Sequence, residues 1–289
     1  MFKGSIVAIV TPMDATGAID YECFARLLDW HLTNGTDGVV VLGTTGESAT
    51  VHMDERKQLI QLATDQIKGR IPVIVGTGTN STDTTIQLTH QALEWGADAA
   101  LVVTPYYNKP TQEGLFQHYK AVAEAVPLPQ ILYNVPSRTA CDLLPETIIR
   151  LGKISNIVGV KEATGDQQRV KQILAADCYV DVFSGDDATG LEFMLLGAKG
   201  VISVTANVVP KLFHDLCLAA LSGERDRASC LDQQLRPLYK ALFLESNPIP
   251  TKWALQELGL IDRGIRLPLT PLTAKFHDAV RQALQQINI

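Results

Sequence analysis

The sequence lacks a hydrophobic run long enough to cross a bilayer. The chain has 289 residues, of which 46% are hydrophobic, but the apolar stretch in its opening MFKGSIVAIVTPMD ends at Pro12 and Asp14. We therefore expect neither a membrane span nor a secretion signal. This composition predicts a globular cytoplasmic protein with a substantial core.

Clusters of Lys and Arg are also missing. The formal net charge is −6, and no basic run is present that could neutralise a phosphate backbone. The segment GTGTN at 76–80 resembles a phosphate loop but has neither the G-x-G-x-x-G spacing nor a P-loop lysine. We expect small-molecule partners and no nucleic acid.

Cysteine and histidine are not spaced as disulfide partners or metal ligands. The five cysteines are odd in number, scattered, and contain no C-x-x-C pair. The six histidines fall on predicted helices or connections, and no two of them are four residues apart. We therefore predict no disulfide framework and no catalytic metal.

Eight short apolar runs rich in β-branched residues divide the first two thirds of the chain. They are continuous rather than alternating, as in strands that are buried on both faces of a parallel sheet. Helical segments lie between them, and eight repeats favour a (β/α)₈ barrel, although a doubly wound open sheet uses the same alternation. The runs are 5–10, 38–43, 71–76, 99–104, 129–134, 156–161, 179–185 and 200–205.

Two of the predicted helices have clear ends. Residues 20–35 start at an N-cap, Asp20, and stop at a glycine, and residues 54–69 are acidic at the start and cationic near the end. From about residue 210 the pattern is helical only. We assign 1–224 to the catalytic barrel and 225–289 to a C-terminal helical region, which we expect to bury one flank or to assist assembly rather than chemistry.

Polar residues follow several of the predicted strands. In a barrel the active site lies at the carboxyl ends of the strands, so these segments are candidates before any motif is considered. They are GTTGES (43–48), TPYYN (104–108), YNVPSRT (133–139), KEATG (161–165) and SGDD (184–187).

Lys161 ends an apolar strand, which predicts an amine in a partly dehydrated barrel mouth. Burial disfavours the charged form of a lysine, and a neutral amine can attack a ketone to form a Schiff base. The alternative is a structural lysine that is ion-paired with a carboxylate such as Glu162.

Other strand-end residues have both catalytic and structural interpretations. Tyr133 could transfer protons beside Lys161, or be a buried tyrosine with a satisfied hydroxyl. Thr44 and Thr45 lie in a glycine-flanked turn that suits a carboxylate, but such turns are also ordinary βα loops.

Arg138 could bind a carboxylate with two parallel hydrogen bonds, or form a surface ion pair. The tandem Tyr106 and Tyr107 could be a packing pair, a lid or an interface anchor. The spacing of these residues does not decide between the alternatives.

Taken together, GTTGES, TPYYNKPTQEGL, YNVPSRT, GVKEAT and SGDD resemble the dihydrodipicolinate synthases, within the pyruvate-dependent class I aldolase family that includes N-acetylneuraminate lyase. The resemblance extends over nearly the whole chain. It implies condensation of pyruvate with L-aspartate 4-semialdehyde to 4-hydroxy-tetrahydrodipicolinate, in diaminopimelate and lysine biosynthesis. No cofactor is implied beyond a covalent imine with pyruvate on Lys161.

The resemblance also implies a role for each matching residue. Lys161 forms the imine and Tyr133 is the general acid/base, in a proton relay with Thr44 and with Tyr107 from a neighbouring subunit. A homodimer that pairs into a tetramer is therefore implied. The substrate-binding matches are Thr45 for the pyruvate carboxylate, Arg138 for the semialdehyde carboxylate, and Gly185 and Ile202 as lining residues.

Two alternative functions remain. N-acetylneuraminate-type lyases resemble this sequence at Lys161 and Tyr133 but do not carry VPSRT after the tyrosine. Arg138, which lies in that segment, therefore argues against a 2-oxo acid lyase. A catalytically silent barrel is the other alternative. Retention of all the lysine, tyrosine, threonine and arginine positions argues against it.

One departure from the family concerns regulation by lysine. Members that are inhibited by lysine bind it between subunits, and this sequence retains Ser48, Ala49, Asn80 and Tyr106 of that cleft. Where sensitive members usually carry a histidine and a glutamate, this chain has Arg56 and Thr84. Because an arginine repels the ammonium groups of lysine, we predict weak or absent inhibition.

Overall fold

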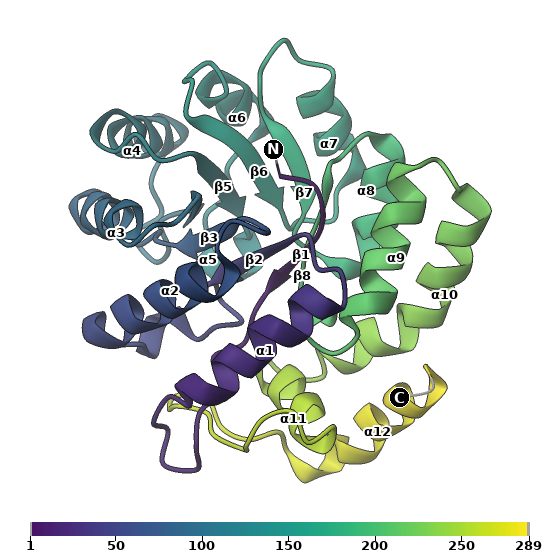
Figure 1. The fold of residues 1–289 in the computed structure, drawn as a ribbon. Coiled ribbons are helices and arrows are strands. Elements are labelled where there is room, and N and C mark those ends of the chain that lie inside the picture. Colours follow the sequence, from purple (N-terminus) through teal and green to yellow (C-terminus); the bar gives the residue numbers. More distant parts are fainter. Residues whose placement is uncertain (1, 288–289) are drawn as a thin grey trace.

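The computed structural model of the chain describes residues 2–287. Its strands are parallel and close into a barrel in chain order, which confirms the barrel and excludes the open sheet (Figure 1). Every strand overlaps its predicted run. The strands are β1 (Gly4–Ala8), β2 (Gly38–Val41), β3 (Val73–Gly76), β4 (Ala99–Val103), β5 (Gln130–Asn134), β6 (Ile157–Glu162), β7 (Asp181–Ser184) and β8 (Gly200–Ser203).

Helices surround the barrel, and within residues 2–287 no helix is long and apolar enough to cross a membrane. The α-helices are α1 (Tyr21–Thr33), α2 (Met53–Ile67), α3 (Thr82–Glu94), α4 (Gln112–Ala125), α5 (Pro136–Thr139), α6 (Pro145–Leu151), α7 (Gln167–Leu174), α8 (Gly190–Leu196), α9 (Pro210–Leu221), α10 (Arg225–Ala241), α11 (Ile249–Glu257) and α12 (His277–Gln286). Short 3₁₀ turns are η1 (Ser48–Thr50), η2 (Asp187–Thr189), η3 (Thr205–Asn207) and η4 (Ala274–Phe276).

The core has two layers, which explains why the strand sequences are continuous rather than alternating. One layer fills the barrel and includes Ile6, Val40, Phe183 and Tyr133. The larger layer lies between the barrel and the helices. Since successive side chains of a strand point to opposite faces, both sets of positions are apolar.

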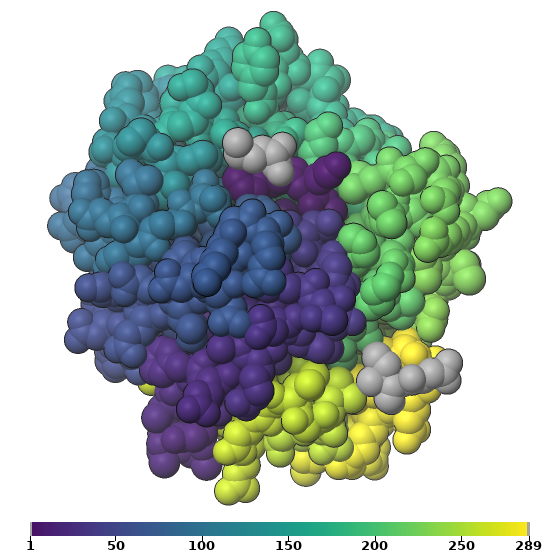
Figure 2. All heavy atoms as spheres, viewed as in Figure 1, coloured from purple at the N-terminus to yellow at the C-terminus, as the bar shows by residue number. Residues whose placement is uncertain are grey.

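Local sequence signals set the helix ends as expected. Asp20 caps α1, because its Oδ1 accepts a hydrogen bond from the Cys23 amide at 2.8 Å. The C-terminal segment returns to this helix, where the Cys23 thiol donates to the Leu260 carbonyl at 3.2 Å. Figure 2 shows the purple surface of the N-terminal segment next to the yellow-green surface of the C-terminal segment in this region.

Candidate active site

A cavity of about 220 Å³ opens at the carboxyl ends of the strands. We call it the mouth cavity. Strands β2, β5, β6 and β7, or the turns that follow them, supply most of its wall. Its lining residues are Thr44, Thr45, Tyr133, Val135, Ser137, Arg138, Lys161, Ala163, Thr164, Gly165, Gly185, Asp186, Val204, Phe243 and Asn247.

Lys161 and Tyr133 lie side by side on β6 and β5. They are paired in the strand register, and Lys161 Nζ lies 4.4 Å from the centre of the Tyr133 ring. Both side chains are buried, with 5% and 7% of their surface exposed. Among residues 2–287 the Tyr133 hydroxyl has no hydrogen-bond partner, so it is free to bind a ligand in the cavity.

Glu162 does not pair with Lys161, so the structural interpretation of this lysine is wrong. Adjacent strand residues point to opposite faces, and Glu162 therefore points away from the mouth. There it accepts hydrogen bonds from Asn134 and from the Thr164 amide, and it lies 3.3 Å from Arg169 Nε. In the part of the chain that the structure describes, Lys161 has no ion-pair partner.

The predicted carboxylate ligands Thr45 and Arg138 meet a residue from the C-terminal region. Asn247 Nδ2 donates to Thr45 Oγ1 at 2.9 Å, and the Asn247 carbonyl accepts from Arg138 Nη2 at 3.3 Å. Arg138 is exposed on the single turn α5 and, among residues 2–287, forms no ion pair. The surface-pair interpretation of Arg138 is therefore wrong.

Gly185 lies directly against the lysine side chain. A Cβ at this position would lie 3.0 Å from Lys161 Cε and 2.7 Å from Ala163 Cβ, so only glycine leaves Lys161 its present path. Ile202 is placed differently from the prediction. It is fully buried in the barrel core with Tyr133, and Val204 lines the cavity instead.

Tyr107 does not reach the mouth cavity of its own chain. Its side chain is 87% exposed, and its φ of 76° lies in the left-handed region, which is uncommon for a bulky residue. Tyr106 is 41% exposed and lines a neighbouring cavity instead. Within this chain the two tyrosines are therefore neither a buried packing pair nor a joint lid.

The neighbouring cavity, of about 540 Å³, contains most of the predicted lysine cleft. We call it the side cleft. Its lining includes Ser48, Ala49, Arg56, Thr84 and Tyr106. It shares four wall residues with the mouth cavity: Thr44, Val135, Arg138 and Asn247.

Asn80 is not among the residues that line the side cleft. Its carbonyl accepts a hydrogen bond from Asn108 Nδ2 at 2.8 Å, between the loops that follow β3 and β4. In the single chain, Asn80 is therefore not part of the cleft wall in which the family resemblance places it.

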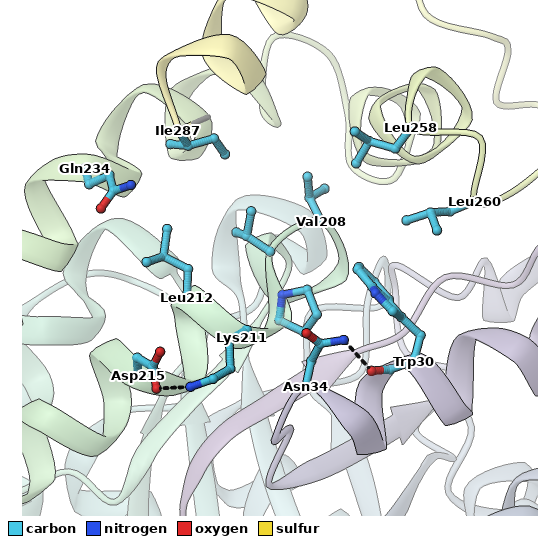
Figure 3. Close-up of a pocket in the computed structure, with 12 residues that line it drawn as sticks. Trp30, Asn34, Val208, Lys211, Leu212, Asp215, Gln234, Leu258, Leu260 and Ile287 are labelled. Atoms are coloured by element: carbon cyan, nitrogen blue, oxygen red, sulfur yellow. Dashed lines mark hydrogen bonds and ion pairs between the residues drawn. The ribbon is translucent and has the colours of Figure 1, made fainter. Parts of the chain in front are cut away.

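A third cavity lies apart from the barrel mouth, between α1, α9, α10 and the end of α11 (Figure 3). It measures about 470 Å³, and its wall is mostly apolar, with Trp30, Leu212 and Leu258 pointing into it. It shares no residue with the mouth cavity. Among residues 2–287, no group of three or more His, Cys, Asp and Glu side chains is arranged to hold a metal ion.

The sequence analysis missed Asn247 and Phe243, although both line the mouth cavity. Both follow α10 in the helical region, away from the strand ends where the active site of a barrel is expected. The expectation that this region only buries a flank or assists assembly is therefore incomplete.

Known proteins closely resemble this chain. The model of the dihydrodipicolinate synthetase family matches residues 1–287. The 4-hydroxy-tetrahydrodipicolinate synthase of Coxiella burnetii (strain Dugway 5J108-111) is 62% identical over 289 residues, covering 100% of this chain and 99% of that protein. The enzyme of the same name from Pseudomonas aeruginosa is 57% identical over 292 residues, covering 100% and 99%.

Solved structures agree with these matches. The chloride-inhibited dihydrodipicolinate synthase from Acinetobacter baumannii, complexed with pyruvate, is similar with a TM-score of 0.98 and 53% identity, and 100% of each chain is covered.

Proposed function

This chain belongs to the dihydrodipicolinate synthetase family, and we propose that it performs the family reaction through an imine between Lys161 and pyruvate. The reaction condenses pyruvate with L-aspartate 4-semialdehyde to give 4-hydroxy-tetrahydrodipicolinate, a step of diaminopimelate and lysine biosynthesis. The observation that carries the proposal is Lys161 itself, which is 5% exposed at the mouth cavity and close to Tyr133. The similarity to synthases favours this reaction over a 2-oxo acid lyase.

The chemistry proceeds by covalent catalysis. The Lys161 amine attacks the ketone carbon of pyruvate and water leaves, giving an iminium that draws electrons from the methyl group. Loss of a methyl proton gives an enamine, whose carbon attacks the aldehyde carbon of the second substrate. The amino group of that substrate then attacks the iminium carbon, which closes the ring and releases Lys161.

Proton transfers and carboxylate binding fall to the surrounding groups. Tyr133 lies close enough to Lys161 to act as general acid/base for the imine steps, with Thr44 as a further hydroxyl in the cavity wall. Two substrates with carboxylates require two anion sites. Thr45 and Arg138 supply these, because both line the same cavity.

The third hydroxyl of the relay comes from a second copy of the chain. Tyr107 is 87% exposed and outside the mouth cavity of its own chain, which supports delivery to a partner's site. The active form is accordingly a homodimer, for which the family resemblance implies pairing into a tetramer. Its cytoplasmic location stays a prediction.

Borohydride trapping tests the imine. We expect intact-protein mass spectrometry after reduction with pyruvate to show one reduced-pyruvate adduct on the parent and none on Lys161→Ala. The matched control is Lys171→Ala, which removes an exposed lysine of α7 and should retain the adduct. Absence of an adduct from the parent would contradict the proposal, and cleavage of N-acetylneuraminate would favour the lyase.

A further inference from the structure

We propose that Asn247 orients the hydroxyl of Thr45 so that this hydroxyl directs its hydrogen to the carboxylate of pyruvate. Asn247 would then be a positioning residue, supplied by the C-terminal region. The proposal rests on the proposed function, since it requires pyruvate in the mouth cavity.

The two ends of the Asn247 amide have different hydrogen-bond partners. Its Oδ1 accepts a hydrogen bond from Thr251 Oγ1 at 3.2 Å, so its Nδ2 is turned to Thr45 Oγ1, 2.9 Å away. Nδ2 is a donor only, and Thr45 must therefore accept. Asn247, Thr251 and Thr45 are all buried, with 5%, 0% and 2% of their surface exposed, so water does not compete freely for these contacts.

A hydroxyl that already accepts still has one hydrogen to donate. Among the residues that the structure describes, Thr45 Oγ1 has no other hydrogen-bond partner, and Thr45 lines the mouth cavity. Its hydrogen is therefore available to a ligand there. A carboxylate fits, because its oxygens only accept, whereas a free threonine hydroxyl could rotate to suit either a donor or an acceptor.

Asn247 is held in place from two further directions. Its carbonyl accepts from Arg138 Nη2, the group assigned to the other carboxylate. One turn later on α11, Lys252 forms a buried ion pair with Glu47, in the same turn as Thr45. Because the contact to Arg138 is made by the backbone carbonyl, the Asn247 side chain can be changed without removing it.

The test compares pyruvate with its neutral methyl ester. For each variant, imine formation is measured by borohydride trapping over a range of ligand concentrations. Asn247→Asp replaces the donor by an acceptor, which draws the Thr45 hydrogen away from the cavity. We expect the half-saturating concentration of pyruvate to rise at least about tenfold, since a hydrogen bond to a charged group is lost. The value for methyl pyruvate should change less than about twofold.

Two more variants separate orientation from charge and from folding. Thr251→Val keeps the Asn247 side chain but removes its anchor, and it should weaken pyruvate alone. In a Thr45→Val background, Asn247→Asp should have a smaller effect on pyruvate than in the parent, because no hydroxyl remains to be oriented. Equal weakening of both ligands, or no change in either, would overturn the inference. Failure of the parent to be trapped would instead overturn the proposed function and the inference with it.

Discussion

Arg56 places a buried positive charge in the wall of the side cleft. Its guanidinium donates to the carbonyls of Gly76, at 2.6 Å, and Ser48, at 3.3 Å, and only 7% of the residue is exposed. Burial lowers the pKa of Arg56 to about 10, which still leaves it protonated at pH 7. Within residues 2–287 no carboxylate forms an ion pair with it, so its charge is not offset by an ion-pair partner.

This charge makes the side cleft unfavourable for a cationic effector. We expect lysine to inhibit the condensation weakly or not at all, since Arg56 repels its ammonium groups and Thr84 offers no carboxylate. Initial rates of condensation at increasing lysine concentration test this. Strong inhibition at lysine concentrations below about one millimolar, within the usual range for binding a metabolite, would contradict it. Arg56→His with Thr84→Glu should increase inhibition, whereas Arg70→His, at an exposed position, should not.

At the residue scale, the positions at the ends of the strands indicated the groups to which we assign the chemistry. Lys161, Tyr133 and Thr45 were predictable because the polar end of a buried parallel strand faces the barrel mouth. Asn247 was not predictable in this way. It lies between helices, and only the return of the C-terminal segment to the barrel brings it to Thr45.

At the scale of elements, a buried ion pair joins α11 to the turn after β2. Lys252 Nζ lies 2.5 Å from Glu47 Oε1 and donates to the Thr11 carbonyl at 2.9 Å. The other Glu47 oxygen accepts from the Arg266 amide at 3.1 Å. The pKa of Lys252 is lowered, chiefly by burial, which Glu47 partly opposes. The pair therefore fixes the turn that carries Thr45 against the C-terminal region.

Removing one partner of this ion pair should lower the free energy of unfolding more than removing both charges. Lys252→Met leaves Glu47 buried and unpaired, and we expect the free energy of unfolding to fall by about 3–5 kcal/mol. Adding Glu47→Gln should recover part of the loss, because the isolated charge is then gone. Urea unfolding followed by circular dichroism measures both variants.

The control for this cycle is an exposed ion pair. Lys211 is paired with Asp215 on α9 but is 61% exposed, so Lys211→Met should change the free energy of unfolding by less than about 1 kcal/mol. If Lys252→Met were no more destabilising than Lys211→Met, the ion pair between α11 and the turn after β2 would not stabilise the fold.

The sequence predicted the elements well and their connections less well. Continuous apolar runs located every strand, because each is buried on both faces. The link between α11 and β2 was beyond prediction, since Lys252 and Glu47 are far apart in the sequence and neither lies in an apolar pattern that marks burial. The division at 224/225 stays a prediction, although α10 does begin at Arg225.

At the scale of the whole molecule, one chain does not bring all the proposed relay groups together. Thr44 and Tyr133 line the mouth cavity, whereas Tyr107 projects from the loop after β4 and is 87% exposed. An isologous dimer exchanges the same residue in both directions, so each site would be completed by the other chain. The residue pattern placed Tyr107 at a strand end, and only the family resemblance implied that it serves a neighbouring subunit rather than its own barrel.

Mixing two inactive variants tests this exchange. Lys161→Ala cannot form the imine, and Tyr107→Phe, which lacks the relay hydroxyl, should retain about 1% of the parental rate or less. In a mixed dimer, the site with Lys161 receives Tyr107 from the Lys161→Ala chain. Random pairing makes about half of the dimers mixed, with one complete site in each, so co-folded equal amounts should regain about a quarter of the parental activity. If Tyr107 served its own chain, or if the chain acted alone, every site in the mixture would lack one group, and activity would stay at the level of the separate variants.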